Sequence, residues 1–260
     1  MLMAMLIATG CGNFTRKNAT KAVDSEIIIQ MWETPENGAQ ALVFGAMTTE
    51  QFPCDNLSIL TEMVKTDDRI DIDFRRVYAD EPECSETGPA FAFIEFGAIS
   101  SGTYQLNIRN GGVRYSGTFT VTPEKYTIDF PDNAAFSFRR VSLNKIPQHT
   151  IWGAISLHHY EGDAEQFVQS FFSDLADMGA TEITLTPGEY THFEIDEEGN
   201  LYRINLDFGQ ASQYFVLRYA GVKDDLEAFL RQVLAKHGHT VMVTMFTDRG
   251  DRLFSWHILP

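Results

Sequence analysis

The histidines are the residues of this chain best suited to chemistry. His158 and His159 stand side by side, close to Glu161 and Asp163, and His239 lies between a predicted helix and the strand that follows it. If that strand runs antiparallel beside the one that ends before His158, the imidazoles approach each other. Neutral imidazoles with a carboxylate form a candidate zinc or nickel site. Successive side chains alternate across a strand, so the same pattern also fits ordinary surface histidines.

The sequence contains no other recognisable catalytic arrangement. The GxSxG, P-loop, HExxH and strand-borne GxGxxG motifs are all absent from it. Asp71 and Asp73 alternate with Ile70 and Ile72, which places both acids on the solvated face of a strand instead of in a calcium loop. We therefore expect no cofactor and predict a protein that is not an enzyme. A metal-dependent or hydrolytic enzyme that uses the histidines and carboxylates of the C-terminal part is the alternative.

The first eleven residues indicate a compartment. An uncharged apolar run ends in Ala8-Thr9-Gly10-Cys11, and the chain turns polar immediately afterwards. Apolar residues followed by small residues and a cut site are typical of a secretory signal. A cysteine directly after the small residues resembles the lipobox of bacterial envelope lipoproteins.

That resemblance implies that Cys11 is acylated and becomes the first residue of the mature chain. The protein would then be held to a membrane of the bacterial cell envelope by an N-terminal lipid anchor. Exported lipoproteins of the Bacteroidota-like type carry acids soon after the cysteine, whereas here Arg16 and Lys17 come first and Asp24 is the first acid. We therefore expect a periplasm-facing anchor instead of surface display.

The composition is that of an acidic globular protein with a net charge of −16. Nucleic acids and anionic lipid surfaces repel such a chain, so no nucleic-acid partner is expected. With Cys11 assigned to lipid, Cys54 and Cys84 form an even pair, and an oxidising compartment favours a disulfide between them. Two unpaired cysteines are the alternative.

Short strands dominate the chain from residue 25 to residue 123. The clearest hairpin joins residues 102–109 to residues 113–121 through Asn110-Gly111-Gly112, because an Asn-Gly turn supplies the positive φ angles that tight hairpins require. About seven strands without a helical period predict an antiparallel β-sandwich. The final hairpin, which ends in Gly-Thr-Phe-Thr-Val, resembles the close of bacterial immunoglobulin-like modules.

The pattern changes near residue 150. Asp163-Ala-Glu-Gln166 has the spacing of a capping box, and Gly179 ends the helix that it begins. A second helix starts at Asp224-Asp225 and ends near Gly238. The order of strand, helix, several strands, helix and two strands predicts an α+β domain with two helices on one face of an antiparallel sheet, ferredoxin-like or similar.

The predicted organisation is therefore multidomain. It consists of a lipoprotein signal and flexible stalk (1–24), an all-β immunoglobulin-like sandwich (25–123), a linker or bridging strands (124–149) and the α+β domain (150–260). We expect a lipid-anchored envelope protein with a binding or adhesion role and either a protein or a glycan as ligand. A glycan-binding module of an uptake system is a further alternative, and it would require an exposed tryptophan, of which Trp32, Trp152 and Trp256 are the candidates.

Overall fold

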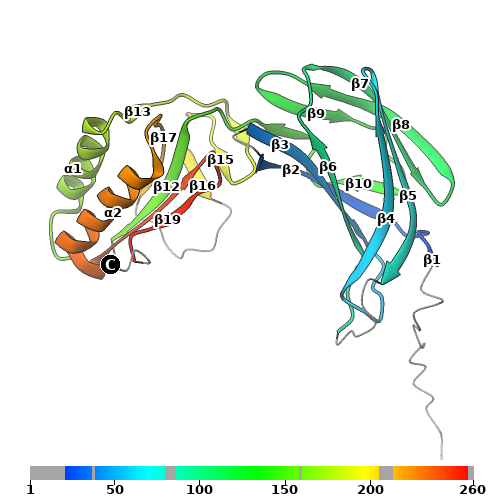
Figure 1. Cartoon of the computed structure of the whole chain (residues 1–260), viewed down its shortest axis with the longest axis horizontal. Coiled ribbons are helices and arrows are strands. Elements are labelled where there is room, and N and C mark those ends of the chain that lie inside the picture. Colours follow the sequence, from blue (N-terminus) through cyan, green and yellow to red (C-terminus); the bar gives the residue numbers. More distant parts are fainter. Residues whose placement is uncertain (1–20, 37–38, 80–85, 158–159, 205–212, 257–260) are drawn as a thin grey trace, which may run out of the picture.

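The computed structural model describes residues 21–36, 39–79, 86–157, 160–204 and 213–256 of the chain (Figure 1). This part of the protein is mostly β, with a large curled sheet, two smaller sheets and two α-helices. The first sheet contains β1 (Lys21–Ala22), β2 (Ile27–Glu36), β3 (Ala39–Thr48), β4 (Leu57–Lys65), β5 (Arg69–Ala79), β6 (Phe91–Gly97), β7 (Gly102–Asn110), β8 (Val113–Val121), β9 (Lys125–Asp129), β10 (Phe136–Phe138) and β11 (Ser142–Asn144).

The remaining elements follow residue 149. They are β12 (Thr150–Leu157), α1 (Ala164–Asp177), β13 (Thr181–Glu182), β14 (Gly188–Glu189), β15 (Phe193–Ile195), β16 (Leu201–Ile204), β17 (Gln213–Arg218), α2 (Lys223–His237), a short 3-10 helix (Gly238–Thr240), β18 (Val241–Thr247) and β19 (Arg252–Phe254). Figure 1 shows the two groups of elements side by side, with the large sheet on the right and the later elements on the left.

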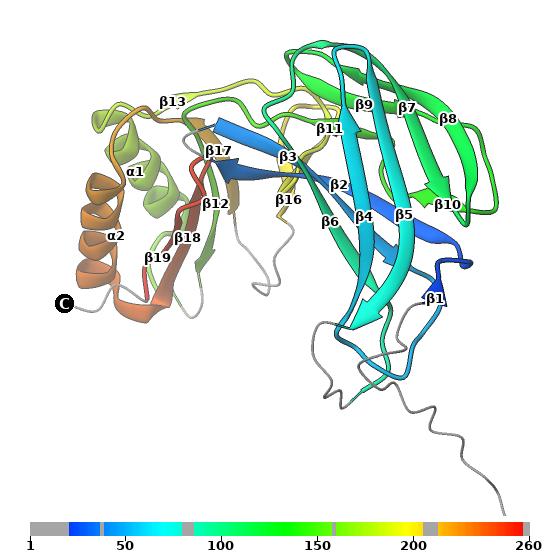
Figure 2. The same ribbon diagram turned by 45° about the vertical axis from the view of Figure 1, so that its right-hand side comes forward.

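The large sheet has the strand order β10-β2-β3-β6-β4-β5-β7-β8-β9-β11, with β1 paired to β5. It curls, so that one face of every long strand points into a common core (Figures 1 and 2). The core is rich in aromatic rings. Phe44 meets Phe96 and Phe119 edge to face, with centroids 4.6 and 5.7 Å apart, and Tyr126 stacks on Phe119 at 6.1 Å. Such ring pairs stabilise a core beyond the area that they bury.

The expected hairpin is present, and its turn is one residue shorter than expected. β7 and β8 pair from Gly102↔Val121 to Asn110↔Val113, so the two turn residues are Gly111 and Gly112. Both have positive φ, at 56° and 80°. Two consecutive positive φ angles match the twist of the flanking strands, and glycine adopts them at little cost.

One detail of the predicted sandwich is wrong. The sheet is mixed instead of antiparallel, because β5 pairs in parallel with β7 and β10 pairs in parallel with β2. Residues 124–149, expected as a linker or bridging strands, contribute β9, β10 and β11 to the large sheet, and Tyr126, Phe136 and Leu143 enter its core. Sequence pattern identifies a strand, but pairing direction depends on the connections between strands.

The second sheet has the order β13-β17-β12-β18-β19, and all of its neighbours are antiparallel. One face packs on α1 and α2 through Ile151, Ile155 and Phe215. The other face packs on the small sheet β14-β15-β16 through Trp152 and Phe246. Both views place the helices side by side on the side away from the large sheet (Figures 1 and 2).

The helix signals predict the helices well. The Asp163 side chain accepts a hydrogen bond from the backbone N–H of Gln166 at 3.0 Å and so caps α1. Gly179 follows the end of α1 with a φ of 93°, and Gly238 follows α2 with a φ of 60°. The buried helix residues are Phe167, Phe171 and Leu175 in α1 and Leu226, Phe229, Leu230 and Val233 in α2. Neither helix, within the described ranges, has the length and apolarity that crossing a membrane requires.

The two cores lead to a prediction about domains. Phe44 is fully buried in the first core and Phe171 is buried in the second. Truncating a buried phenylalanine to alanine destabilises its core by about 3–5 kcal/mol. We expect calorimetry to show two unfolding transitions, with Phe44→Ala lowering one midpoint and Phe171→Ala lowering the other. A single transition that both substitutions lower equally would contradict a division into two folding units.

Candidate functional site

An apolar groove of about 220 Å³ lies on the outer face of β2, β3 and β6, and we call it the aromatic groove. It faces away from the core, because the buried residues of β2 are the alternate ones, Ile27, Ile29 and Met31. Pockets for small ligands usually measure about 300–1,000 Å³, so this groove has room for one ring or face of a longer ligand. Its lining residues are Ile28, Gln30, Trp32, Gly45, Ala46, Met47, Phe91, Phe93 and Arg139.

Trp32 owes its position to Gly45 on the neighbouring strand. A Cβ atom at Gly45 would lie 2.2 Å from Cη2 of the indole and 2.3 Å from Cζ3. The indole therefore rests directly on the glycine backbone, as close approach of a ring to a strand requires. Phe93 meets the same indole edge to face, with centroids 5.9 Å apart.

The phenylalanines of β6 are unusually exposed for their type. Phe93 is 69% exposed and Phe91 is 38% exposed, whereas the alternate residues Ala92, Ile94 and Phe96 face the core. The sequence indicates Trp32 as a candidate but does not single out Phe91 and Phe93. The available signal was a run of apolar residues on both faces of a strand, where a half-buried strand normally has one polar face.

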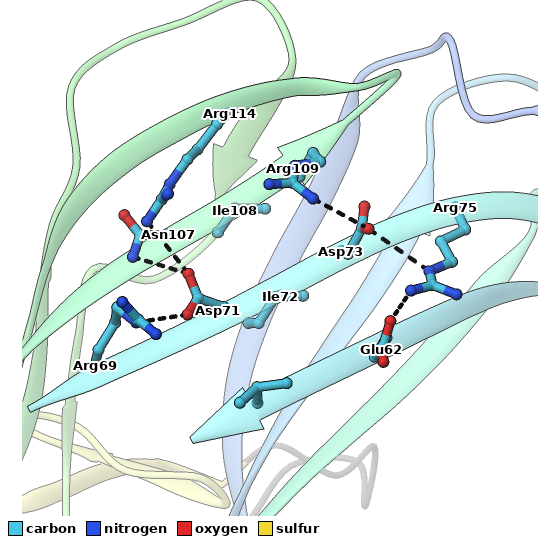
Figure 3. Close-up of a pocket in the computed structure, with 11 residues that line it drawn as sticks. Glu62, Arg69, Asp71, Ile72, Asp73, Arg75, Asn107, Ile108, Arg109 and Arg114 are labelled. Carbon is cyan, nitrogen blue, oxygen red and sulfur yellow. Dashed lines mark hydrogen bonds and ion pairs between the residues drawn. The ribbon is translucent and has the colours of Figure 1, made fainter. Parts of the chain in front are cut away.

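A second depression, of about 330 Å³, lies on the outer face of β4, β5, β7 and β8 (Figure 3). Its charged side chains form ion pairs within β5 and between β5 and the neighbouring strands, and we call this set the arginine–carboxylate ladder. Asp71 accepts from Arg69 Nε at 2.7 Å and from Asn107 Nδ2 at 3.0 Å. Asp73 lies 3.6 Å from both Arg75 and Arg109. Arg114 and Glu62 complete the ladder through Asp71 and Arg75.

The ladder confirms that Asp71 and Asp73 lie on the outer, solvated face, since Ile70 and Ile72 point into the core. Their carboxylates are engaged by guanidinium groups instead of being gathered around a common point. Exposed ion pairs of this kind contribute about 0–1 kcal/mol each. The ladder therefore makes this outer face of the sheet polar. The charges of its carboxylates and guanidinium groups largely balance each other.

A buried carboxyl joins the large sheet to the C-terminal part of the chain. Glu33 of β2 is 2% exposed. Its Oε1 accepts from the Tyr126 hydroxyl at 3.3 Å, and its Oε2 accepts from the backbone N–H of Ile146 at 3.0 Å. Its own backbone N–H donates to Oγ1 of Thr191 at 2.7 Å. One residue thus holds together β2, β9 and two segments that follow the large sheet.

Burial dominates the ionisation of Glu33. It raises the pKa of the carboxyl from 4.5 to about 7, and the hydrogen bonds from Ile146 and Tyr126 and the nearby Lys145 charge oppose that shift only in part. The Lys145 ammonium lies 4.5 Å from the centre of the Tyr126 ring. Burial beside this carboxyl also raises the pKa of Tyr126, so its hydroxyl stays protonated and donates.

The structure describes only some of the residues that the sequence indicates as candidates. Cys11, Cys84, His158 and His159 lie outside the described residues. Lipidation of Cys11, the Cys54–Cys84 disulfide and the shared histidine site therefore stay predictions. Cys54 is buried in the first core, and His239 is exposed in the 3-10 helix after α2.

The strand arrangement behind the histidine prediction is present. β18 pairs antiparallel with β12, and Leu157, the last residue of β12, is opposite Val241, the first residue of β18. Among the residues described here, no three His, Cys, Asp or Glu side chains come close enough to hold a metal ion. A zinc or nickel site at His158, His159 and His239 remains a prediction from the sequence.

Comparison of the chain with protein-family models, with curated proteins and with solved structures found no match. Function must therefore be inferred from the aromatic groove, from the surfaces of the two sheets and from the contacts around the Glu33 carboxyl, which we call the buried junction.

The raised pKa of Glu33 leads to a prediction about pH. The folded state holds the carboxyl protonated up to a higher pH than the unfolded chain does. Stability from this group is therefore fully present below about pH 4.5 and is lost as the pH rises to about 7. The loss is on the order of 3 kcal/mol of unfolding free energy. Glu33→Gln stays neutral, so the variant should gain stability over the wild type at pH 8 and gain little at pH 4.5.

Urea unfolding of both proteins at the two pH values measures this difference. Glu95→Gln is the matched control, because Glu95 is exposed on the outer face of β6. It should leave the pH dependence unchanged. An equal effect of Glu33→Gln at pH 4.5 and pH 8 would show that the carboxyl does not titrate in this window.

Proposed function

We propose that this protein is a lipid-anchored protein of the bacterial cell envelope that binds a carbohydrate on its large sheet. The observation that carries the binding role is the aromatic groove, where Trp32 rests on Gly45 beside the exposed Phe93. Sugar rings offer an apolar C–H face, which packs on aromatic faces, and a polar rim, which needs hydrogen bonds. Gln30 and Arg139 line the same groove and supply an amide and a guanidinium for that rim.

The size of the groove supports binding of one residue of a longer glycan. A groove volume of about 220 Å³ would accommodate a single sugar ring. The remaining sugars of the glycan would then contact the outer face of the sheet. The core behind the groove is filled by side chains such as Phe44 and Ile94, so the outer surface is where the large sheet can meet a ligand.

The proposal includes a finer assignment of the fold. We propose an immunoglobulin-like sandwich followed by a ferredoxin-like α+β domain. The strand order β13-β17-β12-β18, with α1 after β12 and α2 after β17, supports the second assignment. On this assignment, β14, β15 and β16 are an insertion before β17, and β19 is an added edge strand.

The lipid anchor predicts a specific covalent state. In protein extracted from native membranes, mass analysis should find Cys11 as the acylated N-terminal residue, because the stretch Ala8-Thr9-Gly10 precedes it as a cleavage signal. Two or more acyl chains would explain stable anchoring. An intact Met1, or a Cys11 without lipid, would refute the anchor without touching the binding proposal.

The groove predicts which variants lose glycan binding. Trp32→Ala and Phe93→Ala should each weaken binding about tenfold, since each removes an aromatic surface worth roughly 0.5–1.5 kcal/mol beyond its area. Gly45→Ala should also weaken it, because the new methyl group displaces the indole. A glycan array with the full chain identifies the ligand, and titration calorimetry measures its affinity.

Val113→Ala is the matched control, because Val113 is 54% exposed at the start of β8, away from the groove. It should bind as the wild type does. Absence of any glycan ligand on the array, or equal affinities for wild type, Trp32→Ala and Phe93→Ala, would overturn the proposed function.

A further inference from the structure

Two buried hydrogen-bond donors lack an acceptor where the large sheet meets the C-terminal part of the chain. Trp152 of β12 is 2% exposed, and its indole N–H has no hydrogen-bond partner among the residues that the structure describes. The same holds for Nη1 of Arg140, which is buried as well. Nearly all buried polar groups in proteins are hydrogen-bonded, so these two donors require an acceptor that the described chain does not supply.

Arg140 comes from the connection between β10 and β11 of the large sheet. Its side chain is 15% exposed, and its Nε binds the Glu189 carboxylate of β14 at 2.5 Å. Glu189 directly precedes the turn between β14 and β15, which the Tyr190 N–H closes by donating to the Phe193 carbonyl at 2.9 Å. The guanidinium of Arg140 therefore lies beside the turn that carries His192.

The imidazole of His192 connects this arginine to the indole. It stacks on Trp152, with ring centroids 5.7 Å apart and an angle of 11° between the ring planes. Burial lowers the pKa of His192, and the charges of Arg252 and Arg140 lower it further, so both guanidinium groups are near the ring. The imidazole is neutral at pH 7 and offers one N–H donor.

Arg252 belongs to the same face of the second sheet as Trp152. Trp152 is opposite Phe246 in the pairing of β12 with β18, and Phe246 is opposite Arg252 in the pairing of β18 with β19. Residues directly opposite each other point to the same side of a sheet, so all three side chains face the small sheet β14-β15-β16. Arg252 is exposed and has no ion pair with any carboxylate in the described ranges.

These side chains form a group of hydrogen-bond donors, which we call the donor cluster, namely Arg140, Trp152, His192 and Arg252. The cluster holds two guanidinium groups against the single carboxylate of Glu189. Glu194, which is opposite Glu189 in the sheet, is engaged by Arg203 at 3.3 Å. The cluster is thus a positive place in a chain with a net charge of −16. Guanidinium and indole groups donate hydrogen bonds and accept none, so their partner must be an acceptor, and an anion suits them best.

We propose that the donor cluster binds a tetrahedral oxyanion, a phosphate or a sulfate group, between the large sheet and the second sheet. The donors come from the β10–β11 connection, from the second sheet and from the β14–β15 turn, and a tetrahedral anion presents oxygens in all of these directions. A carboxylate presents two oxygens in one plane and would satisfy fewer of them. The exposed Arg252 leads from solvent to the buried donors. The site shares no residue with the aromatic groove, so the proposal does not depend on the proposed function.

Titration of the ¹⁵N-labelled full chain with sodium phosphate or sodium sulfate, at pH 7 and constant ionic strength, tests the proposal by NMR. The indole N–H signal of Trp152, assigned with Trp152→Phe, should move downfield as it donates to the anion. The indole signals of Trp32 and Trp256 are internal controls and should stay in place. The pKa of His192 should rise toward its ordinary value, because a bound anion stabilises the charged imidazolium. Sodium acetate at the same concentration should have a smaller effect.

Calorimetric titration of variants with phosphate measures what each arginine contributes. Arg140→Gln and Arg252→Gln should each weaken binding about tenfold, because each removes a charge-assisted hydrogen bond. Since Arg252 is exposed, Arg252→Gln keeps the test valid even if Arg140→Gln does not fold. Arg231→Gln is the matched control, because Arg231 is exposed on α2, which covers the opposite face of the second sheet. It removes the same charge and should bind phosphate as the wild type does.

Two results would overturn the proposal. One is a Trp152 signal that phosphate and sulfate leave unchanged, as an ordered water on the same donors would give. The other is equal affinity of Arg252→Gln and Arg231→Gln for phosphate. Glucose 6-phosphate distinguishes the source of the anion: tighter binding than inorganic phosphate would indicate a group carried on a larger ligand, and weaker binding would indicate the free ion.

Discussion

The large sheet depends on one constraint, which is that successive side chains of a strand point to opposite faces while only one face is enclosed. In β2 this constraint sends Trp32 outward and Glu33 inward, although the two residues are neighbours in sequence. In β5 it sends Asp71 to solvent and Ile72 to the core. The aromatic groove, the arginine–carboxylate ladder and the buried junction are thus three results of a single alternation.

The same constraint explains why the proposed ligand site lies on an outer surface. The interior of the curled sheet is occupied by interlocking rings around Phe44 and Phe119. Gly45 follows Phe44 directly, and its missing Cβ leaves a place on the outer face where the indole of Trp32 can lie flat against the backbone. A ring held in place and half-buried in this way is a good binding element, since little conformational freedom remains to be lost when a ligand packs on it.

Glu33 links this binding sheet to the rest of the molecule. Its carboxyl lies where β2, β9 and the segments around Ile146 and Thr191 meet, and burial keeps this carboxyl protonated to a higher pH than usual. The C-terminal part is covered differently, by helices on one face and a small sheet on the other.

The sequence by itself determined the local features of this protein. The capping box at Asp163, the glycines that end both helices and the alternation in β5 are encoded within a few residues, and each leads to the predicted element. Tertiary structure decided what depends on distant partners. The parallel pairing of β5 with β7, the inclusion of residues 125–144 in the first sheet, and the exposure of Phe93 all follow from how strands are connected and covered. A short-range pattern fixes the two faces of a strand, but only long-range packing selects which face is buried.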